Sequence, residues 1–139
     1  MRTVQLQHDL PDGSSHVDWM LQSPDDPSGK LVSIRLETRL ESIENGASIH
    51  GFRLDNHRSA YLDYEGPVSN NRGHVHRLEQ GSIVQWVCNG DEWWITLKWS
   101  TTAVQEIRVS GGGSLPQIGC PCLVYAGASS EPEPGVSER

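Results

Sequence analysis

Short segments in which apolar and polar residues alternate recur along most of this chain, each bounded by turn-forming Gly, Pro, Asn or Asp. Side chains two residues apart share one face of a strand, so this period predicts β-strands rather than helices. Nine strands are expected, at residues 3–7, 16–22, 31–36, 49–54, 59–64, 74–78, 82–88, 93–99 and 105–109. Only residues 38–44 have a pattern compatible with a short helix. The expected fold is all-β, a single compact β-barrel of about eight strands, because closure of the sheet leaves no exposed edge.

The C-terminal part of the sequence differs from the rest in composition. It contains Gly-Gly-Gly-Ser and Glu-Pro-Glu-Pro-Gly, which are typical of flexible segments. We therefore expect a barrel domain at residues 1–110 and a Gly/Pro-rich flexible tail at residues 111–139, with a short docked strand at residues 121–126. A total of 139 residues supplies one core of this kind but not two.

The formal net charge of −7 argues against broad coating of nucleic acids, since that binding requires many Lys and Arg contacts to phosphates. Binding to a strand end is compatible with it, because arginines such as Arg53, Arg58 and Arg72 concentrate in the middle third. No apolar run approaches the ~18 residues of a membrane span. No signal-peptide pattern is present either, so no membrane contact and a cytoplasmic location are expected.

Three cysteines, an odd number, do not indicate a disulfide framework. Cys88 lies in a predicted strand and is expected in the core, whereas Cys120 and Cys122 are expected as thiols of the tail. Those two are too closely spaced for the usual paired zinc ligands, so no metal site is expected there.

Two histidines and one aspartate near the N-terminus form the first chemically distinctive group. His16 and Asp18 are two residues apart on a predicted strand and therefore share a face, and His8 lies on the preceding extended segment. If the two segments pair, the three side chains can meet. Two imidazoles and a carboxylate suit a divalent cation such as manganese, iron or zinc, and they leave coordination positions open to water and phosphate. The competing interpretation is a solvated surface pair, since His-x-Asp also occurs by chance.

A second polar group lies further along the chain, between residues 55 and 65. In an extended conformation alternate residues point the same way, which places on one face Asp55, His57, Tyr61, Asp63 and Glu65. Histidine exchanges a proton near neutral pH. His57 could therefore contact a phosphate oxygen or protonate a leaving group, with Tyr61 orienting it.

The two groups together resemble a known family. The matching segments lie in one order between residues 3 and 88: Gln7-His8-Asp9, His16-Val17-Asp18-Trp19-Met20-Leu21, Asp55-Asn56-His57, Tyr61 and Asp63-Tyr64-Glu65-Gly66-Pro67. They look like the 3'-phosphoesterase domain of bacterial DNA ligase D, and more closely like its small stand-alone relatives. The resemblance implies a β-barrel that binds Mn²⁺ and trims the 3' end of a DNA or RNA primer strand in DNA repair, removing a 3' ribonucleotide and then the 3' phosphate. It also implies DNA ligase or other repair proteins as partners.

The resemblance extends to individual positions. The family's metal ligands are matched by His8, His16 and Asp18. His57 matches its phosphate-contacting histidine, Tyr61 its active-site tyrosine, and Asp55 an acidic residue two positions before that histidine. With the charge distribution, this gives as candidate substrate-binding residues His57, Arg53 and Arg58.

The sequence departs from the family at Met20, two residues after Asp18, where the family has an arginine. Loss of that phosphate-binding cation favours an alternative, a catalytically weak or inactive module that binds nucleic-acid ends or another phosphate ligand. A further alternative is the two-histidine, one-carboxylate iron site of an oxygenase, with His74 as the second histidine. Such enzymes need a jelly roll with a deep pocket, for which this chain is short.

Overall fold

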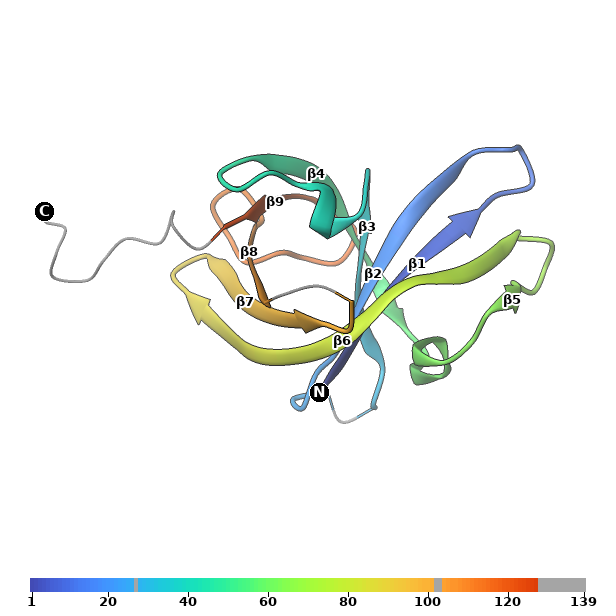
Figure 1. The fold of residues 1–139 in the computed structure, drawn as a ribbon, viewed down its shortest axis with the longest axis horizontal. Coiled ribbons are helices and arrows are strands. Elements are labelled where there is room, and N and C mark those ends of the chain that lie inside the picture. Colours follow the sequence, from blue (N-terminus) through green and yellow to red (C-terminus); the bar gives the residue numbers. More distant parts are fainter. Residues whose placement is uncertain (27, 102–103, 128–139) are drawn as a thin grey trace, which may run out of the picture.

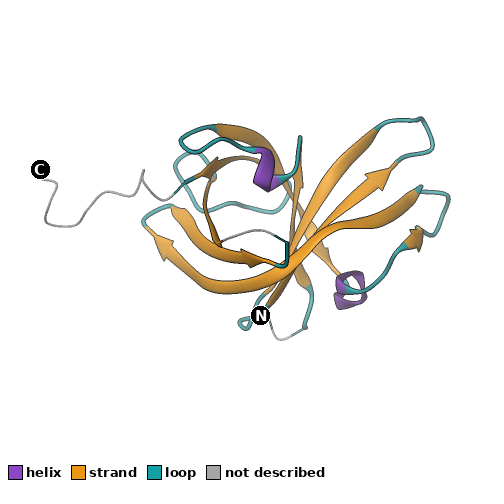
Figure 2. Cartoon of the chain, viewed as in Figure 1, coloured by secondary structure: helices purple, strands orange, loops and turns teal. Residues whose placement is uncertain are grey.

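A computed structural model describes residues 1–26, 28–101 and 104–127 of the chain (Figure 1). The described elements are strands and two short 3₁₀ helices (Figure 2). The strands are β1 (Arg2–Asp9), β2 (Ser15–Gln22), β3 (Leu31–Leu36), β4 (Ser48–His57), β5 (Gly66–Pro67), β6 (His74–Asn89), β7 (Glu92–Trp99), β8 (Val104–Ser110) and β9 (Pro121–Ala126). The helices are η1 (Leu40–Ser42) and η2 (Ser59–Leu62).

Eight strands close into a ring in the order β1-β2-β3-β4-β9-β8-β7-β6, and β6 pairs back onto β1. The pairings are antiparallel, and the short β5 adds to β6 near its start. Strand β6 is long enough to pair with β1 through its first half and with β7 through its second. The expected closed β-barrel is confirmed.

Gly81 marks the point where β6 passes from one partner to the other. It pairs with Thr3 of β1 and with Trp99 of β7. A Cβ at this position would lie 2.3 Å from the carbonyl oxygen of Lys98. A side chain is therefore excluded where the three backbones approach one another, and glycine allows the ring to close.

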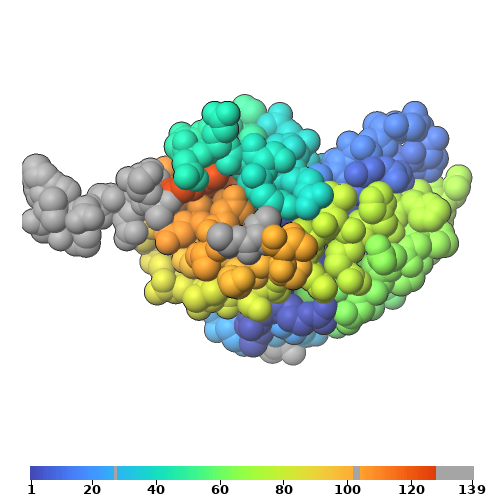
Figure 3. All heavy atoms as spheres, in the orientation of Figure 1, coloured from blue at the N-terminus to red at the C-terminus, as the bar shows by residue number. Residues whose placement is uncertain are grey.

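Two apolar clusters lie on opposite faces of the sheet, because side chains alternate along each strand. The larger cluster fills the ring and includes Trp19, Leu97 and Trp99. The smaller cluster consists of Val4, Leu6, Met20, Leu31, Leu62, Val68 and Val75, contributed by β1, β2, β3, η2 and β6 and by the loop between β5 and β6. Strand β1 pairs with β6, and in the space-filling view the blue N-terminal segment lies beside the yellow-green segment that includes β6 (Figure 3). The smaller cluster supports the polar residues of both groups singled out in the sequence.

Several observed elements differ from the expected ones. The prediction of a strand at residues 59–64 is wrong, because this segment forms the 3₁₀ helix η2. The Tyr61 amide donates a hydrogen bond to the Arg58 carbonyl, and the Asp63 amide donates one to the Ala60 carbonyl. The strands expected at 74–78 and 82–88 are parts of the single strand β6. The helix expected at 38–44 is limited to the single turn of η1. Among the described residues, no helix is long and apolar enough to cross a bilayer.

The strand expected at 121–126 is β9, which pairs with β4 and β8 and fills a position in the ring. The barrel therefore includes residues beyond the expected boundary at 110. The last part of the expected flexible tail, residues 128–139, lies outside the described residues.

The three cysteines are all unpaired thiols. Cys88 is exposed, so its expected place in the core is wrong, and Cys120 is exposed as well. Cys122 lies in β9 instead of a loose tail, and burial raises the pKa of its thiol to about 11. Its thiol therefore stays protonated at neutral pH and acts as a small core side chain.

Candidate functional site

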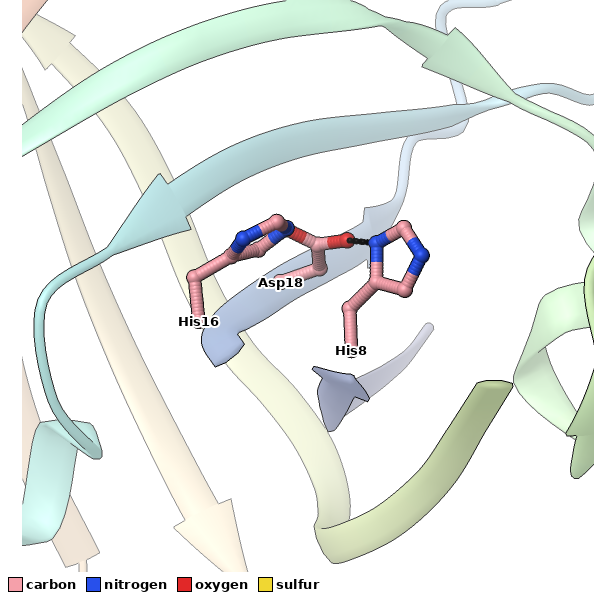
Figure 4. A group of neighbouring side chains, drawn as sticks. All are labelled: His8, His16 and Asp18. Atoms are coloured by element: carbon pink, nitrogen blue, oxygen red, sulfur yellow. Dashed lines mark ion pairs between the residues drawn. The ribbon is translucent and has the colours of Figure 1, made fainter. Parts of the chain in front are cut away.

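The hairpin of β1 and β2 brings together the three candidate metal ligands. His8 lies directly opposite His16 in the register, and Asp18 follows two residues later on the same face of β2. One ligand atom from each of the three side chains lies within 4.8 Å of the others (Figure 4). The convergence expected from the sequence is therefore present, and a tight antiparallel pairing produces it.

Each imidazole in this group places a nitrogen near one carboxylate oxygen of Asp18. His8 Nδ1 lies 3.6 Å from Asp18 Oδ2, and His16 Nε2 lies 3.3 Å from Asp18 Oδ1. The other nitrogen of His8, Nε2, donates a hydrogen bond to the Arg72 carbonyl oxygen at 2.7 Å. Because a carbonyl can only accept, Nε2 carries the hydrogen, and in the neutral imidazole Nδ1 has its lone pair on the side of Asp18. Such an outer hydrogen bond is how proteins orient a metal-binding histidine.

Two atoms of this group are buried without a hydrogen-bond partner among the described residues, His16 Nε2 and Asp18 Oδ1. A buried polar atom that lacks a partner costs about 1–3 kcal/mol, so such atoms need an explanation. A divalent cation bound between the three side chains would contact both atoms. The donor set of two nitrogens and one oxygen, its proximity and its unsatisfied atoms therefore fit a divalent metal.

A cleft of about 690 Å³ opens beside this group. It is lined by residues of the metal group and of the second polar group, by several cations and by part of the smaller apolar cluster. The polar and charged side chains at its wall are His8, Asp18, Arg35, Asp55, Asn56, His57, Arg58, Tyr61, Asn71 and Arg72. Two segments that are far apart in the sequence thus share one concave surface.

His57 is positioned by the end of β4 and by η2. It pairs with Leu31 across the sheet, and its Nδ1 donates to the Asp55 carbonyl oxygen at 2.8 Å. The hydrogen on Nδ1 leaves Nε2 available to accept or deliver a proton. The Tyr61 ring meets the His57 ring edge to face, with 5.7 Å between centroids. Asp55 also lines the cleft, but the contact with His57 is through its backbone.

The predicted shared face of residues 55–65 is only partly present. Because the chain turns into η2 after β4, Tyr61 reaches His57 through a helical turn instead of strand alternation. Asp63 forms an ion pair with Arg2 at 2.9 Å, and Glu65 accepts a hydrogen bond from the Arg77 amide. Neither carboxylate lines the cleft.

Arg58 lines the cleft, but Arg53 does not. The Arg53 guanidinium donates to the Pro116 carbonyl oxygen at 2.8 Å and lies 5.0 Å from the centre of the Trp93 ring. It is thus engaged against the larger core, and its predicted place beside a substrate is not supported. The reason is that the Arg53 side chain lies on the face of β4 that points into the ring, against Trp93 of the larger cluster.

Arg35 is a cleft residue that the sequence analysis missed. It lies opposite Asp18 in the register of β3 and β2, and its Nε is 3.9 Å from Asp18 Oδ1. Its side chain is 45% exposed, and no hydrogen bond to another described residue engages its guanidinium. The available signal was a single charged residue within the apolar strand at residues 31–36, which marks a position facing away from the core.

Met20 and His74 bear on two of the sequence-based alternatives. Met20 is 1% exposed within the smaller apolar cluster, so no cation stands at that position. His74 is exposed and pairs with Asp9, away from the metal group. Among the described residues the three-ligand group consists of His8, His16 and Asp18 alone, so the oxygenase site with His74 is not formed.

No model of a protein family matches this sequence, and no curated protein sequence matches it. The chemical assignment of the cleft consequently depends on its residues and their geometry, together with the motif resemblance.

Proposed function

We propose that this protein is a divalent-metal-dependent phosphoesterase that acts on the 3' ends of nucleic acids. The observation that carries the proposal is the convergence of one donor atom each from His8, His16 and Asp18 beside a cleft that also holds His57 and exposed arginines. Two of these donor atoms, His16 Nε2 and Asp18 Oδ1, are buried without a hydrogen-bond partner among the described residues. Metal ligands, a proton-exchanging group and cations in one cleft are the groups that phosphate-ester hydrolysis requires.

The three ligands would hold the cation, and Mn²⁺ is the ion that the motif resemblance implies. When bound, a divalent cation stabilises negative charge on phosphate oxygens and lowers the pKa of a coordinated water. Hydrogen bonding between His8 Nε2 and the Arg72 carbonyl keeps the His8 ring oriented for this task.

The remaining cleft residues take separate roles. His57 Nε2 contacts a phosphate oxygen or gives a proton to the leaving oxygen, while the edge contact of Tyr61 fixes the ring. Arg35 and Arg58 neutralise the phosphate, and Arg35 supplies the positive charge that Met20 cannot. A net charge of −7 with cations at the cleft suits capture of a strand end better than binding along a duplex.

A second candidate function follows from Met20. With an apolar side chain beside the candidate ligands, the cleft could bind a terminal phosphate without hydrolysing it. The protein would then be a recognition module for nucleic-acid ends, and a partner would carry out the chemistry.

We expect the wild-type protein with Mn²⁺ to release inorganic phosphate from a 3'-phosphorylated DNA oligonucleotide. Asp18→Asn removes the charged ligand at nearly constant size. Its kcat/KM should fall by more than about 100-fold, since even changes to the partners of metal ligands cost roughly 10–100-fold. Phosphate release and oligonucleotide binding are measured side by side. Binding that depends on the 3' phosphate without phosphate release supports the recognition module. If the protein neither binds the oligonucleotide nor releases phosphate, both candidate functions are excluded.

Arg35→Ala should raise the inhibition constant of inorganic phosphate by roughly tenfold or more, because a charge-assisted hydrogen bond contributes about 1.5–3 kcal/mol. Affinity for Mn²⁺ should stay the same or increase, since the removed charge lies 3.9 Å from Asp18. Lys98→Ala, which removes an exposed cation of β7 outside the cleft, is the matched control. Equal phosphate inhibition of the two variants would remove Arg35 from the phosphate site.

A further inference from the structure

An apolar groove of about 230 Å³ continues from the cleft along η2 and β5. It is lined by Arg58, Ala60, Tyr61, Tyr64, Pro67 and Ser69. Arg58 and Tyr61 belong to both the groove and the cleft. A ligand whose phosphate lies in the cleft therefore has a contiguous surface on which its next chemical group can rest.

The groove presents aromatic rings that are held in place. Tyr61 and Tyr64 meet edge to face with 5.9 Å between ring centroids. The Tyr64 hydroxyl donates a hydrogen bond to the Pro67 carbonyl oxygen, and the Tyr61 ring packs on the smaller apolar cluster. Tyr64 is nevertheless 38% exposed, which makes it one of the large apolar side chains at the surface. Ring orientation is thus fixed by the protein while a substantial ring surface faces solvent.

Gly66 contributes to this arrangement. Its φ of +139° is a conformation that favours glycine, and a Cβ there would lie 3.1 Å from the Tyr64 hydroxyl oxygen. The turn between η2 and β5 therefore accommodates the Tyr64 ring over the groove.

Arg58 supplies charge at the junction of groove and cleft. It is exposed, and its guanidinium has no ion-pair or hydrogen-bond partner among the described residues. A cation between an aromatic groove and a phosphate site matches a nucleotide, which carries a flat ring on one side of its sugar and phosphates on the other. Binding sites for single strands combine these two features, and stacking on an aromatic ring tolerates any base.

We infer that the groove binds the terminal nucleobase of the strand whose 3' phosphate occupies the cleft, with Tyr64 as the stacking surface. This inference rests on the proposed function, since it takes the phosphate position from it. The substrate class is then a nucleic-acid end with an intact terminal base, in preference to a small phosphate ester or an abasic end.

The test compares two 3'-phosphorylated single-stranded oligonucleotides that differ only in the terminal residue, which is a normal nucleotide in one and abasic in the other. For the wild-type protein with Mn²⁺, the KM of the normal end should be lower by about tenfold. Tyr64→Leu should raise that KM to the abasic value, with kcat and inhibition by inorganic phosphate unchanged. Tyr125→Leu, at a tyrosine of β9 outside the groove, is the matched control.

Equal KM values for the two ends in the wild-type protein would overturn the inference. So would a Tyr64→Leu variant that weakens both ends equally, because that pattern indicates a structural effect on the cleft. Binding of both oligonucleotides to the wild-type protein and to the two variants is also measured by fluorescence anisotropy. If no phosphate is released, the phosphoesterase proposal fails. In that case, binding that depends on the terminal base and is lost in Tyr64→Leu still supports base binding in the groove. Binding that does not depend on the base, or no binding, overturns the inference.

Discussion

We expect His16→Ala to abolish the rise in melting temperature that Mn²⁺ produces in the wild-type protein. A ligand that binds only the folded state stabilises it by about 2.7 kcal/mol at 100 times its dissociation constant. For a chain of this size that corresponds to a shift of roughly 10 °C. The His16 nitrogen is one of the buried atoms without a partner, so its removal takes away a ligand while costing the metal-free protein little.

The measurement is a thermal melt of each protein with and without the metal. His50→Ala changes an exposed histidine outside the group and should retain the full response. The melting temperature of metal-free His16→Ala verifies that the variant folds. An undiminished response in His16→Ala would show that the three side chains are not the metal site.

His57→Ala should reduce the turnover number by about 100–10,000-fold, the usual contribution of a positioned acid or base. The metal-induced stabilisation should be unchanged, because His57 is not among the three converging ligands. The two effects separate chemistry from metal binding. They are measured by phosphate release at saturating substrate and by the Mn²⁺ melt described for His16.

His76→Ala provides the comparison, since His76 is an exposed histidine of β6 that does not line the cleft. Its turnover should equal that of the wild-type protein. A His57→Ala variant that loses the metal response would make His57 a ligand, and one with normal turnover would exclude it from the reaction.

The central part of the site was predictable from the sequence because it depends on local geometry. His16 and Asp18 share a face of β2 through the two-residue period of a strand. His8 faces them because β1 and β2 form a hairpin around a short turn, so few residues separate the paired positions. The expected all-β barrel follows from the same period, repeated in each strand.

The sequence predicted correctly that His57 and Tyr61 lie together, but it gave the wrong backbone geometry for the second polar group. The alternation applied to residues 55–65 assumes an extended chain, but the backbone turns into η2 after β4. Tyr61 still meets His57, whereas Asp63 and Glu65 are engaged elsewhere. A period of two holds only within a strand, and the end of β4 could not be located from composition.

By itself, the sequence determined the all-β class, most of the strand segments and which residues of one strand or hairpin share a face, because those properties depend on neighbours along the chain. Only the tertiary structure decided that Arg35 stands beside Asp18, that Arg53 turns to the core, and that β9 completes the ring. These outcomes depend on which strands become neighbours and in what register. Contacts between residues distant in the sequence set both, and side-chain packing and backbone pairing across the whole barrel select them together.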